Sequence, residues 1–239
     1  MVTVVLVHGL AGSKNHWNSL LPYLNGLNVV NFEIPGHGES KSLNFDWDST
    51  VAELKTLLPT SGPIIYILHS FAASLTPELI KISNKNDRII LAEGIIHLDD
   101  AKWTKSHAFL DESFFENWVK KFRKGGRVAL KYQLVKSHSK SDIDMWSNGF
   151  SKVNKNAIKI FSRKFVGRLQ NREITKSLKN FKSNIVFIRG ESSNLSKSSL
   201  KNLIKSNIAI HTVSDAGHFP MMDNPKEFYE VICNVLESV

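Results

Sequence analysis

Cysteine is nearly absent from this chain of 239 residues, in which Cys233 is the single one. One cysteine excludes an internal disulfide, and no grouping of cysteine and histidine has the spacing of a metal site. We therefore expect no metal. Cys233 falls in a helical pattern near the C-terminus, where it is interpreted as a small packed side chain.

Long hydrophobic runs are also missing. No stretch approaches the roughly 18 apolar residues that a membrane span requires, so we expect no membrane partner. The N-terminus enters a strand pattern at once, without the basic lead and the small-residue cleavage site of a signal peptide. A cytoplasmic location is the expectation that follows by elimination.

Acidic residues are scarce in the middle of the chain. Residues 101–182 hold 20 Lys and Arg against 6 Asp and Glu, whereas the remainder holds 11 against 16. A basic segment on an acidic body indicates two structural units; it is either a solvated lysine-rich surface or a region that attracts anions. No aromatic-basic motif of a known nucleic-acid module is present, so we expect no nucleic-acid partner.

Short apolar strands alternate with helical patterns over most of the chain. The predicted strands cover residues 3–7, 28–34, 64–69, 87–94, 183–190 and 207–213. Helical patterns cover residues 16–25, 48–58, 71–83, 196–206 and 225–236. This alternation predicts an α/β fold with a mostly parallel six-stranded sheet and helices on both faces.

The alternation stops between the fourth and fifth predicted strands. Residues 99–182 contain no convincing strand. They contain amphipathic helical stretches at 112–124, 127–137, 143–163 and near 174–181. We expect residues 99–182 to form a helical insert on a core made of residues 1–98 and 183–239.

The stretch from Ile64 to Ala73 holds the strongest candidate for chemistry. A continuous apolar strand stops at Ser70, and a helical pattern follows it. A serine at such a turn has its hydroxyl above the sheet, and the free N–H groups of a helix N-terminus can hold a developing anion. This is the geometry of a nucleophile elbow, although Leu68 and Ala72 replace the usual glycines. A simple N-cap is the alternative interpretation.

Two further residues stand at the same edge of the predicted sheet. Glu93 ends the fourth strand and His218 lies in the loop after the sixth. In open α/β sheets, ligands bind at the carboxyl ends of the strands. Serine needs an adjacent base to become a nucleophile, histidine suits that task near neutral pH, and a carboxylate fixes the imidazole tautomer.

With these motifs in place, the chain resembles the α/β-hydrolase superfamily over essentially its whole length. The similarity rests on His8-Gly9 with Trp17, on Pro35-Gly36-His37-Gly38-Glu39-Ser40, on His69-Ser70-Phe71-Ala72-Ala73, on the strand ending Phe187-Ile-Arg-Gly190, and on Asp215 to Pro225. In that family the basic middle segment corresponds to a cap. The resemblance implies a cofactor-independent serine hydrolase.

The resemblance also implies roles for single residues. Ser70 resembles the nucleophile and His218 the general base, and the backbone N–H groups of Leu10 and Phe71 resemble the oxyanion hole. Family members usually carry an aspartate shortly after the strand that ends here at Gly190, but that loop contains none. Some members instead carry the acid at the position of Glu93, which is our first choice.

Other carboxylates remain open as the acid of the triad. Glu191 is the second choice, and Asp99 or Asp100 is the third. The plain alternative for Glu93 is a carboxylate that caps the turn before Gly94. An unpaired charge at the end of an apolar strand is costly to bury, which favours the functional interpretation.

The expected activity is that of a carboxylesterase acting on a small ester or a related acyl substrate through an acyl-enzyme. A thioester, a lactone or a carbon–carbon bond in a diketone stays open. The alternative is a catalytically impaired member of the fold that binds a small ligand, favoured by Leu68, Ala72 and the missing aspartate. A small-molecule acyl substrate is the expected partner, and the sequence does not predict the oligomeric state.

Overall fold

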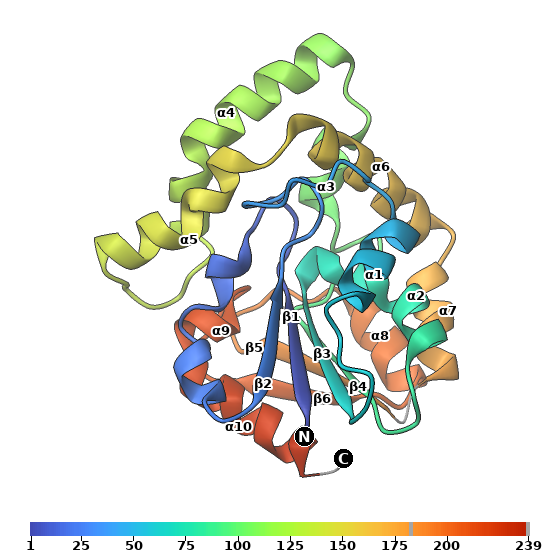
Figure 1. The fold of residues 1–239 in the computed structure, drawn as a ribbon. Coiled ribbons are helices and arrows are strands. Elements are labelled where there is room, and N and C mark those ends of the chain that lie inside the picture. Colours follow the sequence, from blue (N-terminus) through green and yellow to red (C-terminus); the bar gives the residue numbers. More distant parts are fainter. Residues whose placement is uncertain (182–183, 238–239) are drawn as a thin grey trace.

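The computed structural model describes residues 1–181 and 184–237, and in it six parallel strands form one sheet. The sheet has the order β2-β1-β3-β4-β5-β6 (Figure 1). Its strands are β1 (Thr3–Val7), β2 (Asn28–Phe32), β3 (Ile64–His69), β4 (Arg88–Ala92), β5 (Ile185–Gly190) and β6 (Ala209–Val213). The predicted α/β fold is confirmed. The predicted start of the fifth strand at Ser183, and with it the boundary of the insert, lies outside the described residues.

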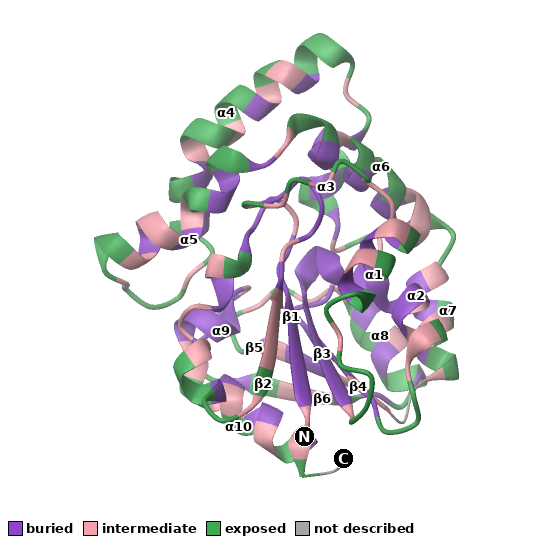
Figure 2. Ribbon diagram, viewed as in Figure 1, coloured by how far each residue is buried: buried purple, intermediate pink, exposed green. Residues whose placement is uncertain are grey.

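The central strands are the most deeply buried elements of the molecule. Every residue of β1 and β3 is buried, whereas the edge strands β2 and β6 are largely half-buried or exposed (Figure 2). Continuous apolar runs such as Ile64–Leu68 suit a parallel sheet because helices cover both of its faces.

Helices pack on both faces of the sheet. One face meets α1 (Trp47–Lys55), α2 (Thr76–Ile82), α7 (Glu173–Asn180) and α8 (Lys197–Lys205). The other face meets the 3₁₀ turns η1 (Lys14–Trp17) and η2 (Leu21–Leu24), α9 (Pro220–Asp223) and α10 (Pro225–Leu236). Two apolar cores result, one on each side of the strands.

A helical segment lies above the carboxyl ends of the strands (Figure 1). It contains α3 (Lys102–Ala108), α4 (Glu112–Lys131), α5 (Lys140–Lys152) and α6 (Lys155–Gln170). We call residues 99–170 the helical cover. The helix α7 follows it but packs against α2 in the core beside the sheet.

Several boundaries inside the cover differ from the predicted ones. The stretch 112–124 and the first part of the stretch 127–137 form the single helix α4, which runs through Gly125 and Gly126 and ends at Lys131, so residues 132–137 are not helical. The stretch 143–163 is instead divided into α5 and α6. The Asn154 side chain accepts hydrogen bonds from the N–H groups of Asn156 and Ala157, so it caps a new helix there.

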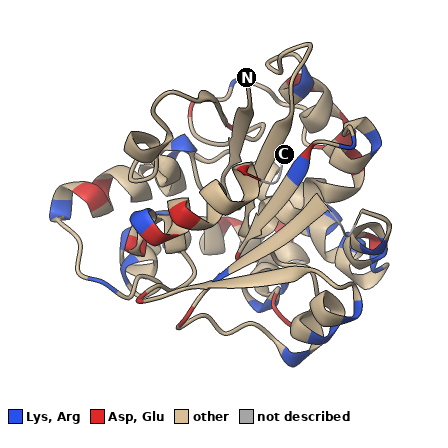
Figure 3. Ribbon diagram, turned by 90° about the horizontal axis from the view of Figure 1, so that it is seen from below, with Lys and Arg blue, Asp and Glu red and all other residues tan. Residues whose placement is uncertain are grey.

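Three of the seven acidic residues of the cover, Glu112, Glu116 and Asp144, form ion pairs with its basic residues. The pairs include Arg127–Asp144, Lys140–Asp144, Lys155–Glu116 and Lys159–Glu112. Seen from below, Lys and Arg also lie on the outer helices around the sheet (Figure 3). Exposed pairs of this kind contribute little to stability.

Among the helices of residues 1–181 and 184–237, none is both long and apolar enough to cross a membrane.

Candidate active site

Ser70 stands at the sharp turn between β3 and the 3₁₀ turn η3 (Ser70–Leu75). Its backbone is left-handed, with φ of +55°, and its side chain is almost fully buried. Such strain is typical of a nucleophile elbow. Gly9 permits the close approach of the neighbouring loop, because a Cβ atom there would lie 3.3 Å from Ser70 Cβ. The turn has Leu68 and Ala72 at the positions of the usual glycines.

The His218 ring meets the Ser70 hydroxyl. His218 Nε2 lies 2.9 Å from Ser70 Oγ, although the two residues are 148 positions apart in the chain. The imidazole side chain is 30% exposed. This geometry allows the ring to accept the hydroxyl proton.

Glu93 lies on the other side of the imidazole. One of its carboxylate oxygens lies 3.4 Å from His218 Nδ1, and the other accepts a hydrogen bond of 2.7 Å from the N–H of Gly190. Glu93 is buried and has a left-handed backbone, with φ of +51°. The end of β5 thus fixes the carboxylate that faces the ring.

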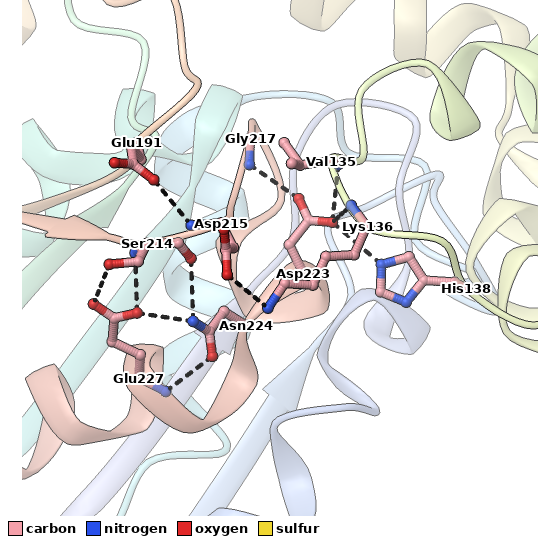
Figure 4. Close-up of polar contacts among 10 residues, drawn as sticks. All are labelled: Val135, Lys136, His138, Glu191, Ser214, Asp215, Gly217, Asp223, Asn224 and Glu227. Atoms are coloured by element: carbon pink, nitrogen blue, oxygen red, sulfur yellow. Dashed lines mark hydrogen bonds and ion pairs between the residues drawn. The ribbon is translucent and has the colours of Figure 1, made fainter.

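The alternative acids lie elsewhere. Glu191 accepts a hydrogen bond from the N–H of Asp215 at 3.2 Å (Figure 4). Asp99 accepts from the Ser198 hydroxyl, and Asp100 accepts from the N–H and hydroxyl of Ser196 and from the hydroxyl of Ser199 at the start of α8. Among the described residues, Glu93 alone forms an acid–imidazole contact with His218. The second and third choices, Glu191, Asp99 and Asp100, are therefore not brought to the ring.

His69 supports the histidine loop from below. Its Nε2–H donates to the carbonyl oxygen of His218 at 2.8 Å. Burial, and then the nearby His218, lower the pKa of His69 well below its usual value. The His69 ring therefore stays neutral with its proton on Nε2. Its hydrogen bond fixes the position of the His218 backbone relative to β3.

A second buried histidine fixes the loop that carries Leu10. His8 Nδ1–H donates to the Gly9 carbonyl at 2.8 Å, and its Nε2 accepts from the N–H of Ile34 at 3.1 Å. Burial is the largest cause that lowers its pKa, so the ring is neutral. This anchoring holds the backbone of Leu10 beside Ser70, where both residues line one cavity.

That cavity has a volume of about 350 Å³ and extends from Ser70 into the helical cover. Phe71 from η3 and Trp103, Phe122 and Phe150 from the cover give it a largely apolar aromatic lining. A second cavity of about 910 Å³ adjoins it and shares His218 but not Ser70. Its lining is more polar and includes Gln133, Ser192 and Asn194.

Within the described part of the chain, no group of three or more His, Cys, Asp and Glu side chains is arranged to hold a metal ion.

One polar residue of the site was not singled out from the sequence. The buried carboxylate of Asp223 binds the N–H of Gly217, next to His218 (Figure 4). Its position just before Asn224-Pro225 is typical of a helix cap, but Asn224 caps α10. That leaves the Asp223 carboxylate available for other contacts.

Comparisons with known proteins agree with this architecture. Residues 4–231 match the family model described as "Alpha/beta hydrolase family". The structure of wild-type Cfl2 from Burkholderia cenocepacia superposes with a TM-score of 0.74 at 18% identity, covering 97% of this chain and 87% of that one. The esterase EaEST from Exiguobacterium antarcticum gives 0.70 at 14% identity, covering 99% and 92%.

A curated sequence shows a shorter similarity. It is the protein of Haemophilus influenzae described as "Putative 2-succinyl-6-hydroxy-2,4-cyclohexadiene-1-carboxylate synthase", 35% identical over 43 residues. The match covers 18% of this chain and 17% of that protein. The two solved structures are too distant in sequence to show more than the fold. The family model, in contrast, spans nearly the whole chain, and we conclude that the chain belongs to the alpha/beta hydrolase family.

Proposed function

We propose that this protein is a serine hydrolase that cleaves small carboxylic esters or related acyl compounds, with Ser70, His218 and Glu93 as its catalytic residues. The observation that carries the proposal is the continuous contact from Ser70 Oγ to His218 Nε2 and from His218 Nδ1 to Glu93. A serine and a histidine joined in this way, with a carboxylate behind the ring, can exchange one proton.

In the proposed reaction, Ser70 Oγ attacks the substrate carbonyl while its proton moves to His218 Nε2. The oxyanion that forms accepts hydrogen bonds from the backbone N–H groups of Leu10 and Phe71. His218 then gives the proton to the leaving group, and a water molecule releases the acyl group in the reverse manner. Each oxyanion donor accounts for about 10²–10³-fold in rate in enzymes of this type.

The two cavities support an assignment of the two halves of the substrate. The cavity with Ser70, Leu10 and Phe71 takes the acyl group, since the attacked carbonyl must lie there. The cavity bordered by His218 takes the leaving group, because the imidazole must reach its oxygen. An aromatic lining and about 350 Å³ suit a short apolar acyl group.

A fluorophosphonate probe tests the proposal directly, because it reacts with an activated serine. We expect intact-mass and peptide analysis to locate one phosphonyl group on Ser70. The Ser70→Ala variant should then stay unlabelled. A wild-type protein that fails to react at Ser70 would instead support the catalytically impaired, ligand-binding alternative.

A panel of p-nitrophenyl esters tests the assigned acyl cavity. The turnover rate should fall as the acyl chain outgrows the cavity beside Ser70. Replacing Phe150, which lines that cavity, by Ala should extend the range toward longer chains. An unchanged preference in Phe150→Ala would contradict the assignment.

A further inference from the structure

Asp223 sits at the end of the one-turn helix α9, five residues after His218. Its side chain has no exposed surface, and its carboxylate accepts four hydrogen bonds (Figure 4). One oxygen accepts from Gly217 N–H at 3.0 Å. The other accepts from the N–H groups of Val135 and Lys136 and from His138 Nε2, at 3.0, 3.2 and 3.2 Å.

The two oxygens therefore bind two different parts of the molecule. Gly217 belongs to the loop that carries His218, whereas residues 135–138 connect α4 to α5 in the helical cover. We call residues 133–138 the α4–α5 connection. The loop and the connection also touch directly, since a Cβ on Gly217 would lie only 2.7 Å from the carbonyl oxygen of Gln133.

These hydrogen-bond donors, rather than an Arg or Lys side chain, stabilise the negative charge of the Asp223 carboxylate. Within the described residues, its single ion-pair partner is His138. A buried carboxylate is tolerated when several N–H groups bind it. If it were removed, three backbone N–H groups in two segments would lose their acceptor at once, and buried donors without partners are costly.

We propose that Asp223 is a positioning residue that fastens the cover to the histidine loop and so holds the His218 ring against Ser70. The proposal rests on the function proposed above. His218 is fixed from below by His69 and from the side by Asp223 through Gly217. Asp223 does not contact the His218 ring, and it acts through the loop alone.

This arrangement makes the geometry of the base depend on the position of the cover. The connection that Asp223 binds also lines the larger cavity, through Gln133, Leu134 and Val135. A shift of the connection pulls on the same carboxylate that holds Gly217. A displacement of a catalytic group by 1 Å can lower a rate about 10²-fold.

The test is the Asp223→Asn variant, in which the side chain keeps its shape but one accepting oxygen becomes a donor. Whichever way the amide is turned, its NH₂ group faces backbone N–H groups, either that of Gly217 or those of Val135 and Lys136. We expect kcat for a p-nitrophenyl ester, and the rate of fluorophosphonate labelling of Ser70, to fall together by about 10²-fold. KM should change less than kcat, since the Asp223 side chain lines neither of the two cavities.

Asp215→Asn is the matched control. Asp215 lies on the same loop and pairs with Lys136 of the same connection at 3.6 Å, but its side chain is 72% exposed. The control should keep kcat within about twofold of the wild type. If Asp223→Asn lowers only the melting temperature and retains the kcat of the control, the proposal is overturned.

Two further measurements test the same coupling. Gly217→Ala adds a Cβ that presses on the carbonyl oxygen of Gln133, so kcat should fall in this variant even if Asp223→Asn does not fold. Amide hydrogen exchange should become faster in residues 133–138 and 214–219 together in Asp223→Asn, and in neither segment in Asp215→Asn. Exchange that rises in one segment alone would refute the coupling. An unreactive Ser70 in the wild type would refute the proposed function instead, while the exchange result still decides the coupling.

Discussion

At the scale of single residues, the chemistry of this site depends on which atom of each side chain faces its neighbour. Glu93 binds Gly190 N–H with one oxygen and faces His218 Nδ1 with the other. Ser70, His218 and Glu93 were each predicted from their places at strand ends. Asp223 was not, because its contacts are made with Val135 and Lys136, which are far away in the sequence.

The Glu93→Gln variant tests the role of the carboxylate. An amide NH₂ facing Nδ1 favours the tautomer with its proton on Nε2, which cannot accept the Ser70 proton. We expect kcat to fall by about 10³–10⁴-fold, in line with the loss seen when a triad acid becomes an amide. Steady-state ester hydrolysis measures it.

The matched control is Glu191→Gln. Glu191 was the second-choice acid, but its carboxylate accepts a hydrogen bond from Asp215 N–H instead of facing His218. Its kcat should stay within about twofold of the wild type. A larger loss of kcat in Glu191→Gln than in Glu93→Gln would show that Glu93 is not the acid that assists His218.

At the scale of elements, the strands were easier to predict than the helices of the cover. Continuous apolar runs located the central strands β1 and β3, since burial on both faces leaves a clear pattern. The edge strands β2 and β6 are less buried, but their positions were also predicted to within two residues. The boundary between α5 and α6 depends on the cap at Asn154, which apolar spacing does not reveal. The continuity of α4 through Gly125-Gly126 depends on tertiary packing.

The two adjacent glycines of α4 offer a matched pair of variants. A Cβ on Gly126 would lie 2.7 Å from the Phe150 ring of α5, whereas a Cβ on Gly125 would meet nothing within 4 Å. We therefore expect Gly125→Ala to stabilise the protein by about 0.5–1 kcal/mol through helix propensity. Gly126→Ala should destabilise it by about 1–3 kcal/mol through overpacking.

Urea unfolding followed by circular dichroism measures both changes. Equal midpoints for the two variants would show that α4 and α5 do not approach each other as closely as the contact between Gly126 and Phe150 requires.

At the scale of the whole molecule, buried histidines link stability to pH. Burial is the main cause that lowers the pKa of His16, His37 and His107 to about 4. These rings are neutral in the folded protein, but in the unfolded chain they take up protons below about pH 6.5. The unfolded state thus binds more protons between about pH 6.5 and pH 4, and folding stability falls as the pH drops through that range.

We expect the free energy of unfolding to decrease steeply from pH 6.5 to pH 4, by about 3 kcal/mol for each of these rings. Chemical denaturation at pH 7, 6 and 5 measures the slope. His107→Gln should make the slope shallower, and His211→Gln, at a partly exposed position on β6, is the control. A free energy of unfolding that stays constant over this range would contradict the burial of neutral rings.

Ester turnover by the Ser70→Ala variant tests most directly whether Ser70 and His218 act together on an acyl substrate. The matched control is Ser74→Ala, which alters a second buried serine, one whose hydroxyl donates to the carbonyl of Phe71 at 2.7 Å. Ser70→Ala should lose at least about 10³-fold in kcat, whereas Ser74→Ala should retain most of it. Undiminished hydrolysis of p-nitrophenyl esters by purified Ser70→Ala protein would contradict the account.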